Sequence, residues 1–151
     1  MCGITERMGP LGLHLYAERY FAAAKALPTL EVPFEPVRPY LVCHAIELGL
    51  KAFLSLKGHP MVNLAEGQLG HKLSAILNEA ELIGLLDAVP LTIAHREAIK
   101  GAETYYAGKV FEYPAVGEAL AAYPSMPSLT VLFEAGALLT SSLAKPCREA
   151  K

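Results

Sequence analysis

The sequence predicts an all-α protein, an antiparallel up-and-down bundle of four to five helices. Apolar residues recur three and four positions apart along four long stretches, the spacing of one helix face. Prolines and glycines separate these stretches by mostly short connections, which favours antiparallel neighbours. No segment repeats at a fixed period, so the pattern is not that of a helical solenoid.

The first two helices are predicted around favourable first-turn prolines. One runs from Pro10 to Leu27 and ends before Pro28, and the next begins at Pro39 with Gly58 as its C-terminal cap. The intervening TLEVPFEPV alternates like a strand, but its prolines remove hydrogen-bond donors from any ladder. We therefore expect an extended connection there.

The second half of the chain holds the remaining predicted helices. They cover Leu69–Ile83, Leu91–Ala107 and Leu129–Ala144, with Val116–Ala122 as a short candidate. Leu85 and Leu86 widen the apolar face of the first of these, and Pro90 is the next break after it. Pro146 is expected to end the last helix, because proline disrupts a helix interior.

Length and composition favour one domain over residues 1–151. The chain of 151 residues is long enough for a core that folds without metals or disulfides. Charged residues make up 19%, below the usual ~25%. This apolar balance suggests either an all-helical core or an apolar face reserved for a partner. The net charge of −2 gives no general reason to expect nucleic acid or an anionic membrane, although a local basic patch stays possible.

The cysteines and termini favour a cytoplasmic protein that does not span a membrane. Three cysteines far apart in sequence do not make a disulfide framework. Glu6 and Arg7 precede any sizeable apolar run, unlike the order in a secretory signal. The Leu129–Ala144 run contains Glu134 and is too short to span a bilayer.

One polar stripe interrupts the otherwise apolar second helix. His44, Glu47 and Lys51 are three and four residues apart and so share a face. If buried, Glu47 and Lys51 need each other and further hydrogen bonds, one of which His71 could supply. Two interpretations stay open: a structural latch between the second and third helices, or a cluster that faces a ligand or takes part in catalysis.

Other chemistries lack the residue spacing they require. No histidine pairs with another His or Cys at a ligand spacing, and the Glu-x-x-His pairs of di-iron bundles are absent, so we expect no metal. No glycine-rich phosphate loop is present, and no cofactor is expected. Cys43 is interpreted as a small buried side chain rather than a nucleophile.

Three segments together resemble the HEPN family of α-helical domains. They are HAIELGLKAFLSLKG, then GHKLSAIL after a loop, then ETYYAGKVFEYP after the next helix. Their order and spacing are similar to the family pattern over roughly Tyr16 to Leu143. The resemblance implies a helical bundle, commonly a homodimer, associated with nucleotides or RNA and with toxin–antitoxin or defence systems.

The resemblance also implies alternative functions. Active members are metal-independent ribonucleases with an Arg followed four to six positions later by a His, and Arg38 and His44 match that spacing. In such a site His44 would act as a general acid or base and Arg38 as a phosphate clamp. Active members usually carry this motif on a late helix, whereas Leu129–Ala144 contains neither residue type. We therefore expect a non-catalytic module that binds a nucleotide, RNA or a partner protein, with the ribonuclease as the alternative. A third class, a purely structural helical partner of a nucleotidyltransferase-like protein, stays open.

Overall fold

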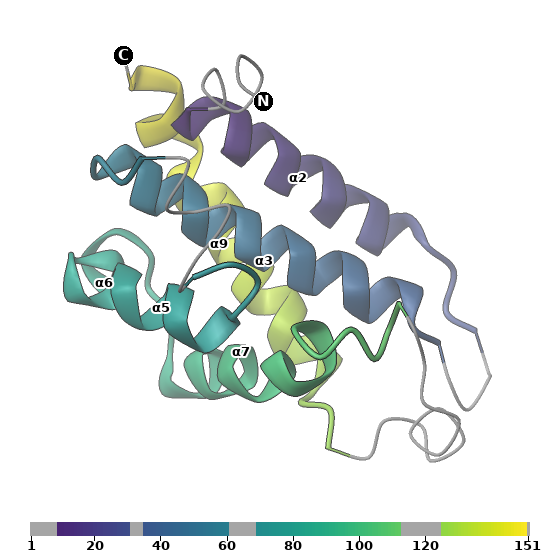
Figure 1. The fold of residues 1–151 in the computed structure, drawn as a ribbon. Coiled ribbons are helices and arrows are strands. Elements are labelled where there is room, and N and C mark those ends of the chain that lie inside the picture. The colour runs from purple at the N-terminus through teal and green to yellow at the C-terminus, as the bar shows by residue number, and fades with distance from the viewer. Residues whose placement is uncertain (1–8, 31–34, 61–68, 113–124, 151) are drawn as a thin grey trace.

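The protein is an all-α helical bundle, as the sequence predicts. The computed structural model describes residues 9–30, 35–60, 69–112 and 125–150, and these ranges contain no strand. The helices are α2 (Pro10–Ala26), α3 (Val37–Leu56), α5 (Leu73–Leu82), α6 (Leu85–Ala88), α7 (Ile93–Tyr106) and α9 (Leu129–Glu149) (Figure 1). The short candidate Val116–Ala122 lies outside the described residues.

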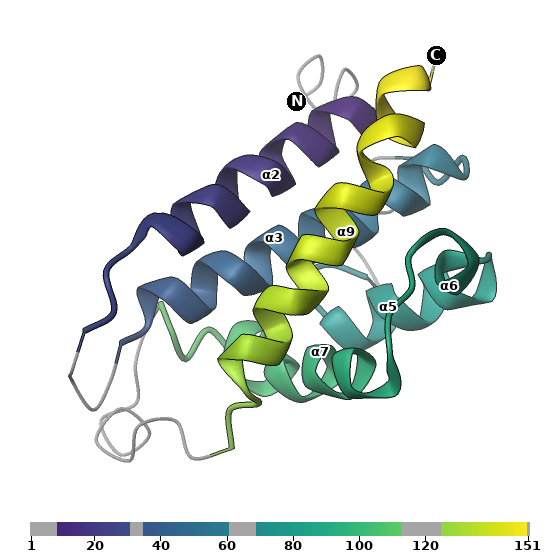
Figure 2. The same cartoon turned by 180° about the vertical axis from the view of Figure 1, so that it is seen from behind.

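Helix α3 occupies the centre of the bundle. It runs antiparallel to α2 (Figure 1), and α9 crosses the α2–α3 pair on the face that Figure 2 turns toward the viewer. Helices α5 and α7 also contact α3. Between Cys43 and Leu54 only His44 on this helix is not buried. By length and composition α3 is also the one described helix that could cross a membrane, yet 72% of that stretch is buried inside the protein. Its apolar residues therefore contact other helices.

Helix α3 begins two residues before the predicted Pro39. The Glu35 carboxylate accepts hydrogen bonds from the backbone N–H groups of Val37 and Arg38, each at 3.0 Å. It thereby satisfies two donors that a helix start leaves unpaired. Proline needs no donor in the first turn, so Pro39 does not delay the helix. Arg38 is therefore part of the first turn.

Gly58 caps α3 as predicted. Its φ of +97° is a left-handed conformation that glycine adopts without a steric penalty. The N–H of His59 bonds to the carbonyl of Leu54, and the N–H of Gly58 to that of Ser55, both at 3.0 Å. These two bonds define a Schellman motif, which satisfies carbonyls that the helix end would otherwise leave free.

The third predicted helix is shorter than its apolar pattern. Helix α5 starts at Leu73 rather than Leu69 and ends at Leu82. Gly84 then takes a φ of +101°, so the chain turns before α6 instead of continuing as one rod. Leu85 and Leu86 keep the helical spacing of the residues before Ile83, but this spacing does not reveal that the chain turns at Gly84.

Helix α9 continues past Pro146, so the expectation that this proline ends the helix is wrong. A proline inside a helix removes one hydrogen bond and costs about 3 kcal/mol. Cys147 in the following turn has no exposed surface and belongs to the main core. Burial of Cys147 is the gain that offsets the lost bond.

The helix starting near Leu91 is confirmed as α7. Thr92 caps it: its hydroxyl accepts from the His95 N–H, and His95 Nδ1 accepts from the Thr92 N–H. This reciprocal arrangement is a capping box with histidine in the place usually taken by Glu or Gln.

Candidate functional site

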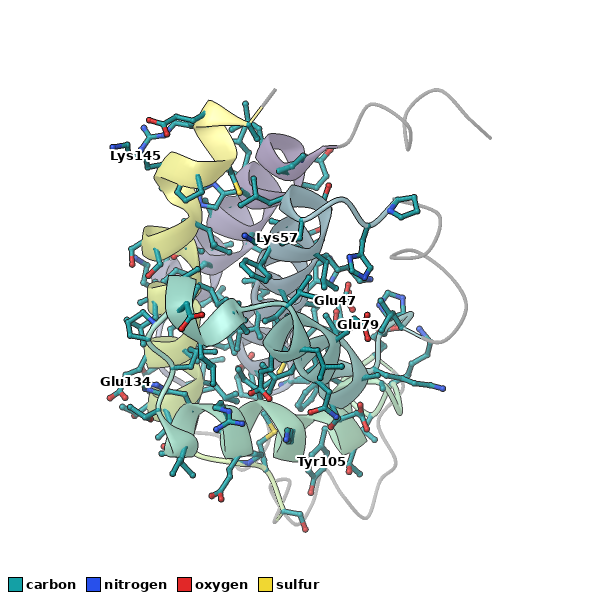
Figure 3. All side chains as sticks on the ribbon, turned by 90° about the vertical axis from the view of Figure 1, so that its left-hand side faces the viewer. Glu47, Lys57, Glu79, Tyr105, Glu134 and Lys145 are labelled. Atoms are coloured by element: carbon teal, nitrogen blue, oxygen red, sulfur yellow. The ribbon has the colours of Figure 1, made fainter. Side chains whose placement is uncertain are left out.

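Glu47 is the centre of a buried polar cluster. It lies in the middle of α3, on the side that faces α5 and α7 (Figure 3). Its side chain is 2% exposed. A carboxylate this deeply buried requires charge compensation and several donors.

Three donors from three segments satisfy this carboxylate. Lys51 Nζ, one turn further along α3, lies 3.2 Å from Oε2. Tyr106 at the end of α7 donates its hydroxyl to Oε1 at 3.0 Å. His71, in the turn before α5, places Nδ1 2.6 Å from the same Oε1. One side chain of α3 thus links two other parts of the fold.

The polar stripe predicted from the sequence is therefore brought together with His71. His44 lies one turn before Glu47, with Nδ1 3.9 Å from Oε2, and its shortest polar contact is to Tyr106. Lys51 is 4% exposed, whereas the His71 side chain is 56% exposed. The cluster therefore runs from the core at Lys51 to the surface at His71.

His44 is the member of the stripe with an aromatic surround. Its ring stacks on Tyr40 at a centroid distance of 5.7 Å and meets Tyr20 of α2 edge-on at 4.4 Å. Nδ1 lies 2.6 Å from the Tyr106 hydroxyl. The side chain is 18% exposed, so solvent or a small ligand group can reach part of this ring.

The environment keeps His44 neutral. Burial lowers the pKa of His44 below its ordinary value of 6.5, and the nearby Glu47 carboxylate opposes this shift only in part. Burial and then the charge of Glu47 raise the pKa of Tyr106, so this hydroxyl stays protonated. The two side chains are therefore an uncharged pair at neutral pH.

Arg38 does not join this cluster in the described residues. Its guanidinium lies over the Phe133 ring of α9, 4.8 Å from the centroid, and Nη1 donates to Thr29 Oγ1 at 3.2 Å. The contacts of His44 are made instead with Tyr20, Tyr40 and Tyr106. The Arg–His pair expected from the resemblance thus has its two members in different surroundings.

Neither Cys43 nor the histidines form a second reactive centre in the described residues. Burial raises the pKa of the Cys43 thiol to about 12, so it remains protonated and unreactive. No group of three or more His, Cys, Asp or Glu side chains converges as metal ligands in those parts of the chain. At Glu47 itself, the charged partner in contact with Oε2 is the ammonium of Lys51.

Tyr106 is the member of the cluster that the sequence did not assign. It follows the buried Ala98 and Ala102 at helical spacing, which could have placed it on the inner face of α7. The Tyr-Tyr pair in the third motif was the available signal. Tyr40 lies four residues before His44 on α3, so helical spacing could have placed it beside the ring. Tyr20 carried no comparable signal, because only the tertiary fold brings α2 beside His44.

No protein-family model, curated protein or solved structure matches this chain. The fold and site define an all-α bundle whose central helix carries a buried carboxylate–ammonium pair beside a neutral, partly exposed histidine.

Proposed function

We propose that this protein is a HEPN-like, non-catalytic module that binds a nucleotide or single-stranded RNA at the surface around His44. The observation that carries the proposal is the setting of this histidine: partly exposed, neutral and in contact with three tyrosine rings. Proteins recognise unpaired bases by stacking them on aromatic or histidine rings and by hydrogen bonds to their edges.

The buried cluster supports this role by holding His44 in place. Tyr106 is hydrogen-bonded to Nδ1 of His44, Glu47 accepts from the Tyr106 hydroxyl, and Lys51 in turn holds Glu47. A binding side chain that is held by packing and hydrogen bonds loses little conformational entropy when a ligand arrives. The latch and the binding site are thus two parts of one arrangement.

The position of Arg38 favours binding over cleavage. A ribonuclease of the expected type needs a cation beside the histidine to stabilise the phosphate in the transition state. Arg38 is held over Phe133 and bonded to Thr29. A charge engaged there does not serve as a clamp at His44.

A metal-independent ribonuclease that uses Arg38 and His44 is the second candidate. The observation in its favour is that His44 is neutral, which lets an imidazole accept the proton of a ribose 2′-hydroxyl. This candidate requires Arg38 to leave Thr29, or a second protomer to supply a cation.

We further propose that the protein acts as a homodimer in a toxin–antitoxin or defence system. Leu11, Leu15 and Tyr16 are exposed on α2, and such apolar side chains suit a contact between copies. Light scattering on the protein and on Leu15→Glu tests the oligomeric state. A dimer that the substitution dissociates supports a homodimer through α2, and a monomeric wild type contradicts the homodimer.

RNA binding and cleavage can be measured in one experiment. A fluorescently labelled single-stranded RNA is mixed with the protein in EDTA, and anisotropy and gel analysis report binding and cutting. We expect binding without cleavage, and about tenfold weaker binding for His44→Ala, a loss of about 1.4 kcal/mol.

The matched control is His59→Ala. His59 is also partly exposed and has a carboxylate partner, Glu79, but it lies outside the cluster. An affinity that falls equally in both variants contradicts binding at His44. Metal-independent cleavage lost in His44→Ala and Arg38→Ala overturns the proposal and establishes the ribonuclease.

A further inference from the structure

The hydroxyl of Tyr106 lies between a carboxylate and an imidazole. It is 3.0 Å from Glu47 Oε1 and 2.6 Å from His44 Nδ1. A phenol has one proton to donate. The direction of the two hydrogen bonds therefore follows from which neighbour can only accept.

Glu47 is that neighbour. Its carboxylate is paired with the ammonium of Lys51 at 3.2 Å, and an ionised carboxylate donates nothing. The Tyr106 proton therefore points to Glu47. The hydroxyl oxygen is left as the acceptor for His44, whose Nδ1 must carry the proton at this short distance.

This leaves the other ring nitrogen of His44 without a proton. A neutral imidazole carries one proton, so Nε2 holds a lone pair and accepts hydrogen bonds. No hydrogen bond joins Nε2 to any residue in the described ranges, and the ring is partly exposed.

We infer that Tyr106, oriented by Glu47, is a positioning residue that fixes His44 as its Nδ1–H tautomer and makes Nε2 the acceptor for a ligand. The inference rests on the binding site proposed above and gives its hydrogen-bonding character. The ligand group at His44 is a donor, such as a hydroxyl or an amino group, and not a phosphate oxygen. The same logic orients metal-binding histidines, in which a partner on one ring nitrogen sets the state of the other.

The tautomer is measurable without a ligand. Long-range hydrogen–nitrogen correlation NMR on the histidine-labelled protein at neutral pH distinguishes protonated Nδ1 from protonated Nε2. We expect the Nδ1–H pattern for His44 in the wild type. In Tyr106→Phe, which keeps the ring and removes the acceptor oxygen, we expect that pattern to be lost.

Tyr105→Phe is the matched control. Tyr105 is the neighbouring buried residue on α7, and its hydroxyl accepts from the Ser125 N–H at 2.9 Å. Figure 3 shows Tyr105 apart from Glu47, the centre of the cluster. This substitution also removes a buried hydroxyl and should leave the His44 tautomer unchanged. An Nε2–H tautomer in the wild type, or the same spectrum in Tyr106→Phe, overturns the inference. The wild-type spectrum decides the tautomer even if Tyr106→Phe does not fold.

RNA affinity separates this inference from the proposed function. We expect Tyr106→Phe to bind the labelled RNA several-fold more weakly than Tyr105→Phe. An Nδ1–H tautomer in a wild type that binds no RNA refutes the proposed function and leaves the positioning role intact. Tight RNA binding together with an Nε2–H tautomer refutes the positioning role and leaves the proposed function intact.

Discussion

Replacing Lys51 with methionine removes the positive charge from a buried ion pair and keeps a side chain of similar length. Glu47 would then remain in the core with two hydrogen-bond donors, Tyr106 and His71, and without the ammonium of Lys51. Removing one partner of a buried pair costs about 3–5 kcal/mol. Because two donors remain, we expect the lower end, about 3 kcal/mol.

This loss is large enough to measure by thermal unfolding. For a chain of 151 residues, each kcal/mol shifts the melting temperature by roughly 2–4 °C, so Lys51→Met should melt about 6–12 °C lower. Lys57→Met is the matched control, since Lys57 is exposed at the end of the same helix. We expect its shift to stay within about 0.5 kcal/mol.

A double substitution isolates the charge from the loss of packing. Glu47→Gln with Lys51→Met removes both charges, so the double variant should be more stable than Lys51→Met alone. Equal melting temperatures for wild type and Lys51→Met would show that the pair is solvated and that the burial argument is wrong. A double variant less stable than either single one would refute the role of the stranded charge.

Three further outcomes follow from the structure. Because burial lowers the pKa of His44, the unfolded chain binds a proton that the folded chain does not, so the free energy of unfolding should fall as pH drops below about 6.5. Unfolding curves of His44→Gln at several pH values should show a smaller fall over this range. An equal fall in both proteins contradicts the lowered pKa. In Gly136→Ala the new Cβ would lie 2.8 Å from the Phe21 ring, and this crowding should destabilise the protein by about 1–3 kcal/mol in denaturant titration. Equal unfolding midpoints for the variant and the wild type would mean that α2 and α9 move apart without cost to make room for the methyl group. Pro146→Ala restores a donor for the Ser142 carbonyl inside α9 and should stabilise by about 1–3 kcal/mol; a lower midpoint would show that the proline ring itself contributes to packing.

Helical periodicity predicted the fold class and most helix positions. The ends were predicted where a residue imposes its own backbone geometry, as Gly58 does. They were missed where tertiary contacts decide, as at Pro146, where burial of Cys147 carries α9 past a residue that usually ends a helix. Gly84 illustrates the other failure: a glycine inside an apolar pattern is compatible with a helix until its φ is known.

The candidate site was predictable only in part. The i, i+4 spacing on an apolar helix was enough to pair Glu47 with Lys51. The place of His71 at the start of the next predicted helix suggested it as a third partner. Tyr106 was missed because its helical spacing after Ala98 and Ala102 indicates the inner face of α7 but not that it reaches a carboxylate on α3. For the same reason the spacing of Arg38 and His44 gave no information on Phe133, the residue that Arg38 contacts.

The central position of α3 has a consequence for the order in which the protein forms during synthesis. Helix α2 precedes α3 and packs along it, so this pair can form early from contacts close in sequence. Helix α9 also covers α3, and Leu139 lies against Gly49, but it leaves the ribosome much later. Until then the apolar face of α3 that α9 covers has no partner from its own chain. We expect this interval to be the one in which the nascent protein depends most on chaperones.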